Sequence, residues 1–580
     1  MEKQPDKKKE ATREQWGSQT DFIMSCISFS VGLGNVWRFP YKAYKNGGGA
    51  FLLPYLICVV TCGIPMFFLE IALGQYMQKG VIGIWDIHPA MRGLGYSSTV
   101  TGFLTNCYYI MVVVWGGFYL LKTVSSIGDE GLPWETCDPS WGATAACLDG
   151  AVGNQTFEQF NPETECKFLS NSTLGSEMAV KQYWRYAALQ IGPDVQNPNT
   201  GVQPEIFTIF TAFWVICYFC VCRGTKSSGK VVYFTAIFPY IVMISLLLRA
   251  ITLPGAMTGI MYLIKPQFHT ILNVRVWIEA GTQVFFSYAI GVGALSALGS
   301  YNKKNSNSYK HAIMISVINS GTSILAGLTV FAFLGVMSCQ TGIPVEDVAA
   351  KGPGLAFITY PLGVSFMPNS KMWAGLFFFM LISLGFGSQI VTVQGLITAL
   401  YDIVPERYQT EVNNNSKSGF VENFFKIETL SFVVCFTCFL IGIPFTYRSG
   451  IWIFNIFDNF AASGTTLLWL VFFEAVTIGW LYGADKFYDN IEEMLGFKPN
   501  VLFKISWKYI TPTMCLTIFV CSTFVDYTRM EDKEFGFEYQ WWHEGIGWCL
   551  ALSSMVCVPA WFLRERSRNR GTKGKPTFGF

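Results

Sequence analysis

The 580-residue sequence has few charged residues and almost no histidine. Asp, Glu, Lys and Arg make up 14% of the chain, and its four histidines are scattered. The 17 cysteines show no metal-ligand spacing, and the apolar segments hold no cluster of nucleophile, metal ligands or acid–base residues. These absences argue against an enzyme. The net charge of +2 gives no case for nucleic-acid binding.

Apolar residues dominate instead. Hydrophobic residues make up 51% of the chain and aromatic residues 16%, and the mean hydropathy is +0.35. This composition predicts an all-α integral membrane protein. Spans of about 20 residues are predicted at twelve places, and no cleaved signal peptide is expected before the first: 20–43, 51–76, 97–122, 205–222, 231–252, 277–300, 312–337, 372–401, 427–446, 450–481, 507–525 and 545–563.

Lysine and arginine predict the orientation. They collect before the first span, in the loops at 223–230 and 303–310, and after the last span. Twelve crossings place all of these segments on one side, which the positive-inside rule makes cytoplasmic. We expect cytoplasmic tails at 1–16 and 565–580, flanking a twelve-helix domain at 17–564 in the plasma membrane.

The segment 125–203 is then a large extracellular loop. It contains two glycosylation acceptor patterns, at Asn154 and Asn171. Cys137 and Cys147 lie ten positions apart in a compartment that permits disulfides, and we favour a bond between them, with Cys166 as a competing partner. The remaining cysteines are expected to be small core residues.

Two apolar segments are interrupted by glycines. They are S-V-G-L-G-N-V-W-R-F-P-Y at 30–41 and Q-V-F-F-S-Y-A-I-G-V-G at 283–293. Unwound backbone at mid-membrane depth is tolerated only where it is buried in protein or lines a cavity. Spans one and six are therefore predicted to be broken helices, which indicates two inverted five-helix repeats around a transporter's binding site.

Polar side chains occur at the same depth. Asn35, Ser287 and Asn319 offer the oxygen ligands that a hard cation such as sodium prefers. The alternative is that they join helices by hydrogen bonds. Because they come from the two breaks and from span seven, the pattern favours an ion site.

Charged residues within the spans are expensive and usually paired. Arg38 and Asp458 are predicted to pair as an outer gate, and Arg13 and Asp402 as an inner latch. The alternative for the outer pair is a structural ion pair that never opens. Glu70 in the second span is given no role beyond structure.

Five motifs together resemble the neurotransmitter:sodium symporter family. They are G-L-G-N-V-W-R-F-P-Y at 32–41, N-G-G-G-A-F-L-L-P-Y at 46–55, Q-V-F-F-S-Y at 283–288, G-S-Y-N at 299–302 and Y-G-A-D-K-F at 482–487. The resemblance extends from about Arg13 to the last span. It implies a symporter that works by alternating access within one chain, so an oligomer is possible but not required.

The resemblance also implies ion sites, with Na⁺ and Cl⁻ as co-transported ions. The ligands of the first sodium ion would be Ser30, Asn35, Ser287 and Asn319, and those of the second Ser28, Val31, Leu384 and Ser388. The chloride ligands would be Tyr55, Gln283, Ser287 and Ser323. Close relatives carry an aspartate just before the serine that Ser388 matches. Here that position is Gly387, so the second sodium site is expected to be weaker.

Gly32 points to the substrate class. Monoamine carriers of the family have an aspartate at this position, so the resemblance implies a zwitterion that brings its own carboxylate. The implied substrate residues are Phe29, Gly32, Leu33, Gly34, Thr105, Tyr109, Phe286 and Ser388.

Within the family, segments such as F-I-M-S-C at 22–26 and A-S-G-T-T-L-L-W at 462–469 are most similar to the branch that carries creatine, taurine, GABA and betaine. Creatine is favoured, and Ala289 in place of glycine speaks against GABA. Thr105, Ser28 and Ser30 depart from the creatine pattern toward a more polar pocket. The alternative is a sensor-like homologue that does not transport.

Overall fold

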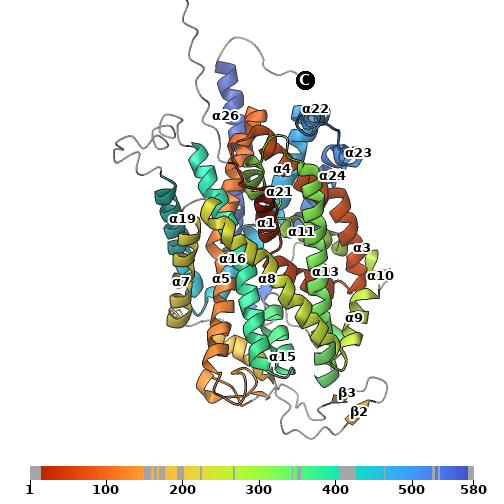
Figure 1. The fold of residues 1–580 in the computed structure, drawn as a ribbon, viewed down its shortest axis with the longest axis vertical. Coiled ribbons are helices and arrows are strands. Elements are labelled where there is room, and N and C mark those ends of the chain that lie inside the picture. The colour runs from red at the N-terminus through yellow and green to blue at the C-terminus, as the bar shows by residue number, and fades with distance from the viewer. Residues whose placement is uncertain are drawn as a thin grey trace, which may run out of the picture.

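Helices form almost all of the regular structure that the computed structural model describes (Figure 1). The described residues are 15–145, 147–148, 159–161, 166–168, 177–192, 201–222, 225–265, 268–341, 344–348, 354–403, 426–462, 464–525, 530–532 and 536–571. All structural statements below concern these residues.

The first eight α-helices lie in the N-terminal half of the chain. Their bounds, with two π-helical turns, are α1 (Gln19–Ser30), η1 (Gly34–Arg38), α2 (Phe39–Lys45), α3 (Gly49–Cys58), η2 (Val59–Gly63), α4 (Ile64–Met77), α5 (Gly93–Ser125), α6 (Ala179–Gln182), α7 (Pro204–Val221) and α8 (Thr225–Ile251).

The rest of the chain also contains long helices and short breaks. It contains α9 (Ala256–Ile264), α10 (Phe268–Ile271), α11 (Val274–Ser287), α12 (Ala294–Ser300), α13 (Ser308–Thr341), α14 (Val345–Val348), α15 (Tyr360–Ser365), α16 (Ser370–Ile403), α19 (Ile427–Gly442), α20 (Gly450–Phe460), α21 (Thr465–Val476), α22 (Ala484–Leu495), α23 (Val501–Ile505), α24 (Thr511–Val520), α25 (Trp541–Met555) and α26 (Cys557–Gly571).

The helices confirm an integral membrane protein. Nine of the described helices are long and apolar enough to cross a membrane, and the pair α1 and η1–α2, bent by 45°, makes a tenth. The spans predicted at 277–300 and 507–525 fall on shorter pieces: the first on α11 and α12, and the second on α24 with the π-helical turns η10 (Ser506–Ile510) and η11 (Cys521–Val525). The exact count of twelve and the inverted repeats stay predictions.

Burial separates central helices from peripheral ones. The best apolar window of Ser370–Ile403 is 83% buried, whereas that of Trp541–Arg568 is 28% buried. α16 packs against α5, α8 and α1, and α1 lies in the middle of the bundle (Figure 1). Small residues allow such close approach. A Cβ added at Gly259 of α9, for example, would lie 1.8 Å from the Phe331 carbonyl oxygen of α13.

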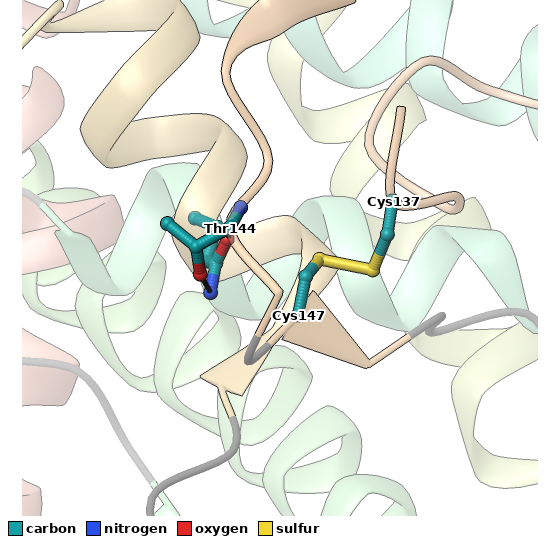
Figure 2. Close-up of a disulfide and its surroundings, with 4 residues drawn as sticks. Cys137, Thr144 and Cys147 are labelled. Atoms are coloured by element: carbon teal, nitrogen blue, oxygen red, sulfur yellow. Dashed lines mark hydrogen bonds between the residues drawn. A yellow bond between two sulfur atoms is a disulfide. The ribbon is translucent and has the colours of Figure 1, made fainter. Parts of the chain in front are cut away.

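The predicted disulfide is present. Cys137 and Cys147 are bonded, and beside them Thr144 exchanges hydrogen bonds with Gln182 (Figure 2). Cys339 is also disulfide-bonded, so the expectation that it is a free core cysteine is wrong. Asn154 and Asn171 lie outside the described residues.

In the described part of the chain, six short strands pair into three two-stranded sheets. The pairs are β1 with β4, β2 with β3, and β5 with β6, and β2 and β3 lie at the end of the molecule opposite α26 (Figure 1). Their bounds are β1 (Cys147–Leu148), β2 (Gln159–Asn161), β3 (Cys166–Phe168), β4 (Glu177–Met178), β5 (Glu531–Asp532) and β6 (Phe537–Glu538).

Candidate functional site

A cavity of about 70 Å³ lies between the two helix breaks, α5 and α16. Roughly five water molecules fill such a space at about 10–15 Å³ each, which suits a solute of amino-acid size. Seven of the eight predicted substrate residues line it, and Leu33 is the exception. The lining is Phe29, Ser30, Gly32, Gly34, Asn35, Thr105, Tyr109, Phe286, Ser287, Ala289, Val292, Ser388, Gln389, Thr392, Ala462 and Leu467.

The break after α1 positions backbone amides at the cavity. The Leu33 amide donates to the Tyr109 hydroxyl at 3.3 Å, and the Gly32 amide donates to Asn35 Oδ1 at 3.1 Å. A Cβ added at Gly32 would lie 2.7 Å from Ser388 Oγ and 3.0 Å from the Tyr109 hydroxyl oxygen. The space beside Gly32 is therefore too tight for a side chain.

The second break follows α11 and is caused by residues with left-handed backbone angles. Gly291 and Gly293 have φ values of 86° and 83°, and Ala289, which is not a glycine, has φ 50°. These left-handed residues stop the helix at Ser287, and α12 begins at Ala294. Ala289 and Val292 line the cavity, so unwound backbone borders it from both breaks.

The structure brings Asn35, Ser287 and Asn319 together. Asn35 Nδ2 lies 2.6 Å from Asn319 Oδ1 and 3.2 Å from Ser287 Oγ. Asn319 Nδ2 in turn lies 3.3 Å from the Ser287 carbonyl oxygen. All three side chains are buried. We name these three residues the amide cluster, and their oxygens are of the kind that hard cations prefer.

A second polar group centres on Ser388 of α16. Its hydroxyl lies 3.2 Å from the carbonyl oxygens of Ser28 and Phe29 and 3.5 Å from that of Leu384. We name Ser28, Phe29, Leu384 and Ser388 the carbonyl cluster. Val31, the fourth predicted ligand of the second sodium site, caps the C-terminal end of α1, and Ser30 of the first site lines the cavity. The carbonyl cluster therefore gathers three of the four predicted ligands.

Ser28 occupies the space next to Gly387. A Cβ added at Gly387 would lie 2.2 Å from Ser28 Oγ and 3.0 Å from Thr235 Oγ1, and these two hydroxyls hydrogen-bond at 3.0 Å. A side chain at position 387 and the Ser28 hydroxyl thus exclude each other. The hydroxyl oxygens of Ser28 and Thr235 therefore lie beside position 387, where close relatives carry an aspartate.

The predicted chloride residues lie beside the amide cluster. Tyr55 hydrogen-bonds to Ser323 and, at 3.3 Å, to Ser320, and Ser323 Oγ accepts a bond from Asn35 Nδ2 at 2.8 Å. Gln283 Nε2 donates to the Gly34 carbonyl oxygen at 3.3 Å. The hydroxyl and amide donors therefore gather in one region.

The gate residues lie in different surroundings. The Arg38 guanidinium stacks over Phe286, 3.8 Å from its ring centroid, and Tyr108 donates to Asp458 Oδ1 at 3.4 Å. Among the described residues, Arg38 and Asp458 form no ion pair within 4.0 Å, and both act electrostatically on Tyr108.

The inner latch is only half described. Asp402, at the end of α16, lies against Gly80, where an added Cβ would be 2.1 Å from Asp402 Oδ2. Arg13 lies outside the described residues.

Three residues of the site were not predicted from the sequence. Glu279 of α11 forms ion pairs with Lys42 and Lys45 of α2, which join one helix of each broken pair. Thr235 and Gln389 reach the site from α8 and α16. The spacing of Lys42 and Lys45, three residues apart, indicates one charged helix face, but no local pattern identifies Glu279 as its partner.

The comparisons with known proteins agree with this geometry. A family described as the sodium:neurotransmitter symporter family matches residues 13–569. The chain is 44% identical over 568 residues to "Sodium- and chloride-dependent creatine transporter 1" of Oryctolagus cuniculus, covering 97% of this chain and 84% of that protein. It is 45% identical over 561 residues to "Creatine transporter" of Torpedo marmorata, covering 97% and 87%.

A relative with another named substrate is almost as similar. "Sodium- and chloride-dependent GABA transporter 2" of Rattus norvegicus is 42% identical over 560 residues, covering 96% of this chain and 88% of that protein. Because the family match spans nearly the whole sequence, the chain belongs to the sodium:neurotransmitter symporter family.

Proposed function

We propose that this chain is a Na⁺- and Cl⁻-dependent symporter that imports a small zwitterionic solute, with creatine as the first choice. The observation that carries the proposal is the cavity between the two helix breaks. Its described lining contains hydroxyls, amides and backbone N–H groups but no Asp, Glu, Lys or Arg. A zwitterion, whose own charges balance, is compatible with such a lining.

The carboxylate end of the solute belongs at the first break. The N-terminal end of η1, which begins at Gly34, exposes partial positive charge at this break, and Tyr109, held by the Leu33 amide, offers a hydroxyl. The tight space beside Gly32 supports the absence of a protein carboxylate at this place. The amide cluster lies next to it, so a bound sodium ion and the solute carboxylate attract each other.

The cationic end has an acceptor in Gln389. Its Nε2 donates to the carbonyl oxygen and to Oδ1 of Asn106, both at 3.2 Å, which turns the amide so that Oε1 is buried without a donor. Such an oxygen favours a ligand with N–H groups. A guanidino group brings several, the ammonium of taurine or GABA brings fewer, and the quaternary amine of betaine brings none. This order supports creatine over the other three.

Coupling follows from the shared location of the ions and the solute. Sodium at the amide cluster and a solute carboxylate each raise the affinity of the other, and this coupling is reciprocal. Sodium at the carbonyl cluster and chloride near Tyr55 complete the proposed ion set. Rocking of the broken helices then opens the Arg38 and Asp458 side or the Arg13 and Asp402 side in turn.

The orientation belongs to the same proposal. We place the chain in the plasma membrane with both tails in the cytoplasm and the loop 125–203 outside, glycosylated at Asn154 and Asn171. The charge distribution supports this arrangement, as does a disulfide between Cys137 and Cys147 in that loop.

Uptake into cells that express the chain tests the function. Radiolabelled creatine, taurine, GABA, betaine and glycine are compared, with sodium or chloride replaced in turn. Accumulation of creatine that needs both ions is expected. A GABA or taurine signal would overturn the choice of substrate, and no uptake of any solute by protein at the cell surface would point to a sensor-like homologue.

A further inference from the structure

Two carboxyl groups face each other in the protein interior, on α4 and α21. Glu70 is 1% exposed and Glu474 is 2% exposed, and their side chains are within hydrogen-bonding range of each other. Each keeps one oxygen, Oε2, that receives no bond from an N–H or O–H donor. Neither residue lines the central cavity, so the proposed ion and solute sites leave this pair unused.

Such a pair is stable only when it binds something positive. An ionised carboxylate has no hydrogen to donate, and two adjacent carboxylates in a dry interior repel each other strongly. No Arg, Lys or His of the described residues acts on either group. The titratable neighbours are Cys515 of α24, which lies near Glu474, and Cys62 of η2, which lies near Cys515.

A proton fits this place better than a metal ion. Among the described residues, no third His, Cys, Asp or Glu joins the pair to form a metal site. One proton between the two carboxyl groups supplies both the missing donor and the missing positive charge. The Gly291 amide donates to Glu70 Oε1 at 2.6 Å, so Glu70 already acts as an acceptor and Glu474 is the natural donor.

The same contact connects the pair to the transport machinery. Gly291 lies in the break between α11 and α12, and its neighbours Ala289 and Val292 line the cavity. A Cβ added at Gly291 would lie 3.3 Å from Leu470 of α21. The unwound segment is thus held between α4 and α21 at the place where the two carboxyl groups meet.

We propose that Glu70 and Glu474 form a proton-binding site that fastens the unwound segment of the second broken helix to α4 and α21. Loss of the proton leaves two like charges beside that segment and loosens it. The claim about the proton stands on its own, whereas its effect on transport rests on the proposed function.

Infrared spectroscopy of the purified full-length protein tests the proton directly. At neutral pH we expect the carbonyl stretch of a protonated carboxyl group in the wild type and its loss in Glu474→Gln. A spectrum that is the same in the wild type, Glu474→Gln and Glu70→Gln would overturn the proposal. This readout needs no transport, so it is independent of the substrate.

The dependence of uptake on pH tests the consequence. In the wild type, uptake of the accepted solute should fall by about tenfold per pH unit once a single proton is released at alkaline pH. Glu474→Gln carries a permanent N–H donor in place of the proton, so its uptake should stay level over the same range. Cys515→Ala is the control and should fall like the wild type. A Glu474→Gln profile that falls in parallel with the wild type would overturn this part.

Discussion

The amide cluster and the carbonyl cluster lie on the same cavity but are built differently. The amide cluster joins three side chains from three segments through mutual hydrogen bonds. The carbonyl cluster surrounds one hydroxyl with backbone oxygens of α1 and α16. Side chains are lost with one substitution, whereas a carbonyl survives a change of residue. The amide cluster should therefore be intolerant of substitution and the carbonyl cluster adaptable.

The sequence around the carbonyl cluster already shows such an adaptation. Gly387 stands next to Ser388, and Ser28 fills the adjoining space together with Thr235. Two neutral hydroxyls replace the volume of a charged side chain. The predictions below test whether the two clusters differ in this way.

Substitution of Asn35 by alanine should have the largest effect. Asn35 donates to Asn319 and Ser323 and accepts from the Gly32 amide. The loss leaves several buried groups unpaired at about 1–3 kcal/mol each, so uptake should fall by about a hundredfold or more. Uptake kinetics at saturating sodium measure it, with surface labelling as the expression control. Uptake within twofold of the wild type would contradict the claim that the amide cluster is intolerant of substitution.

Gly32 touches both clusters, and Gly32→Ala should have the next largest effect. Its amide binds Asn35, and an added Cβ would lie 2.7 Å from Ser388 Oγ. Overpacking of this kind costs about 1–3 kcal/mol, or about 5- to 150-fold in solute affinity. Solute titrations of uptake check the value. Gly321→Ala is the matched control, because nothing lies within 4 Å of a Cβ there, and equal losses in both variants would refute the argument.

Restoring the carboxylate at position 387 should fail unless Ser28 is removed as well. Gly387→Asp alone places a Cβ 2.2 Å from Ser28 Oγ, and we expect about a tenfold loss of uptake from a clash of about 1–2 kcal/mol. The double variant Ser28→Gly/Gly387→Asp should recover uptake and bind sodium more tightly than the wild type. Sodium titrations of the two single variants and the double variant give the coupling. Additive effects would mean that the two positions are independent.

Ser28→Ala should have the smallest effect. It removes the hydroxyl bond to Thr235 but keeps the Ser28 carbonyl beside Ser388. One neutral hydrogen bond is worth about 1 kcal/mol, so the apparent affinity for sodium should fall by about fivefold. Sodium titration of uptake measures it, and Ser245→Ala on the exposed face of α8 is the control. A loss of uptake as large as that of Asn35→Ala would show that the two clusters do not differ in their tolerance of substitution.

Local patterns were enough to predict part of this architecture. Paired glycines predicted the two breaks, and Asn35, Ser287 and Asn319 were recognisable because polar groups are rare at that depth. Glu279 was not predictable as a partner of Lys42, because 237 positions separate them and only the packing of α2 against α11 brings them together. Glu474 was missed for the same reason: its significance depends on Glu70 of a distant helix.

The ion pairs of Glu279 with Lys42 and Lys45 have a mechanical consequence. They join α2 to α11, and each of these helices belongs to one of the two broken helices. Each broken helix has its own glycine break, so each has its own hinge. In the proposed transport cycle, the ion pairs therefore make α2 and α11 move together, and we expect the cavity to open or close in a single movement.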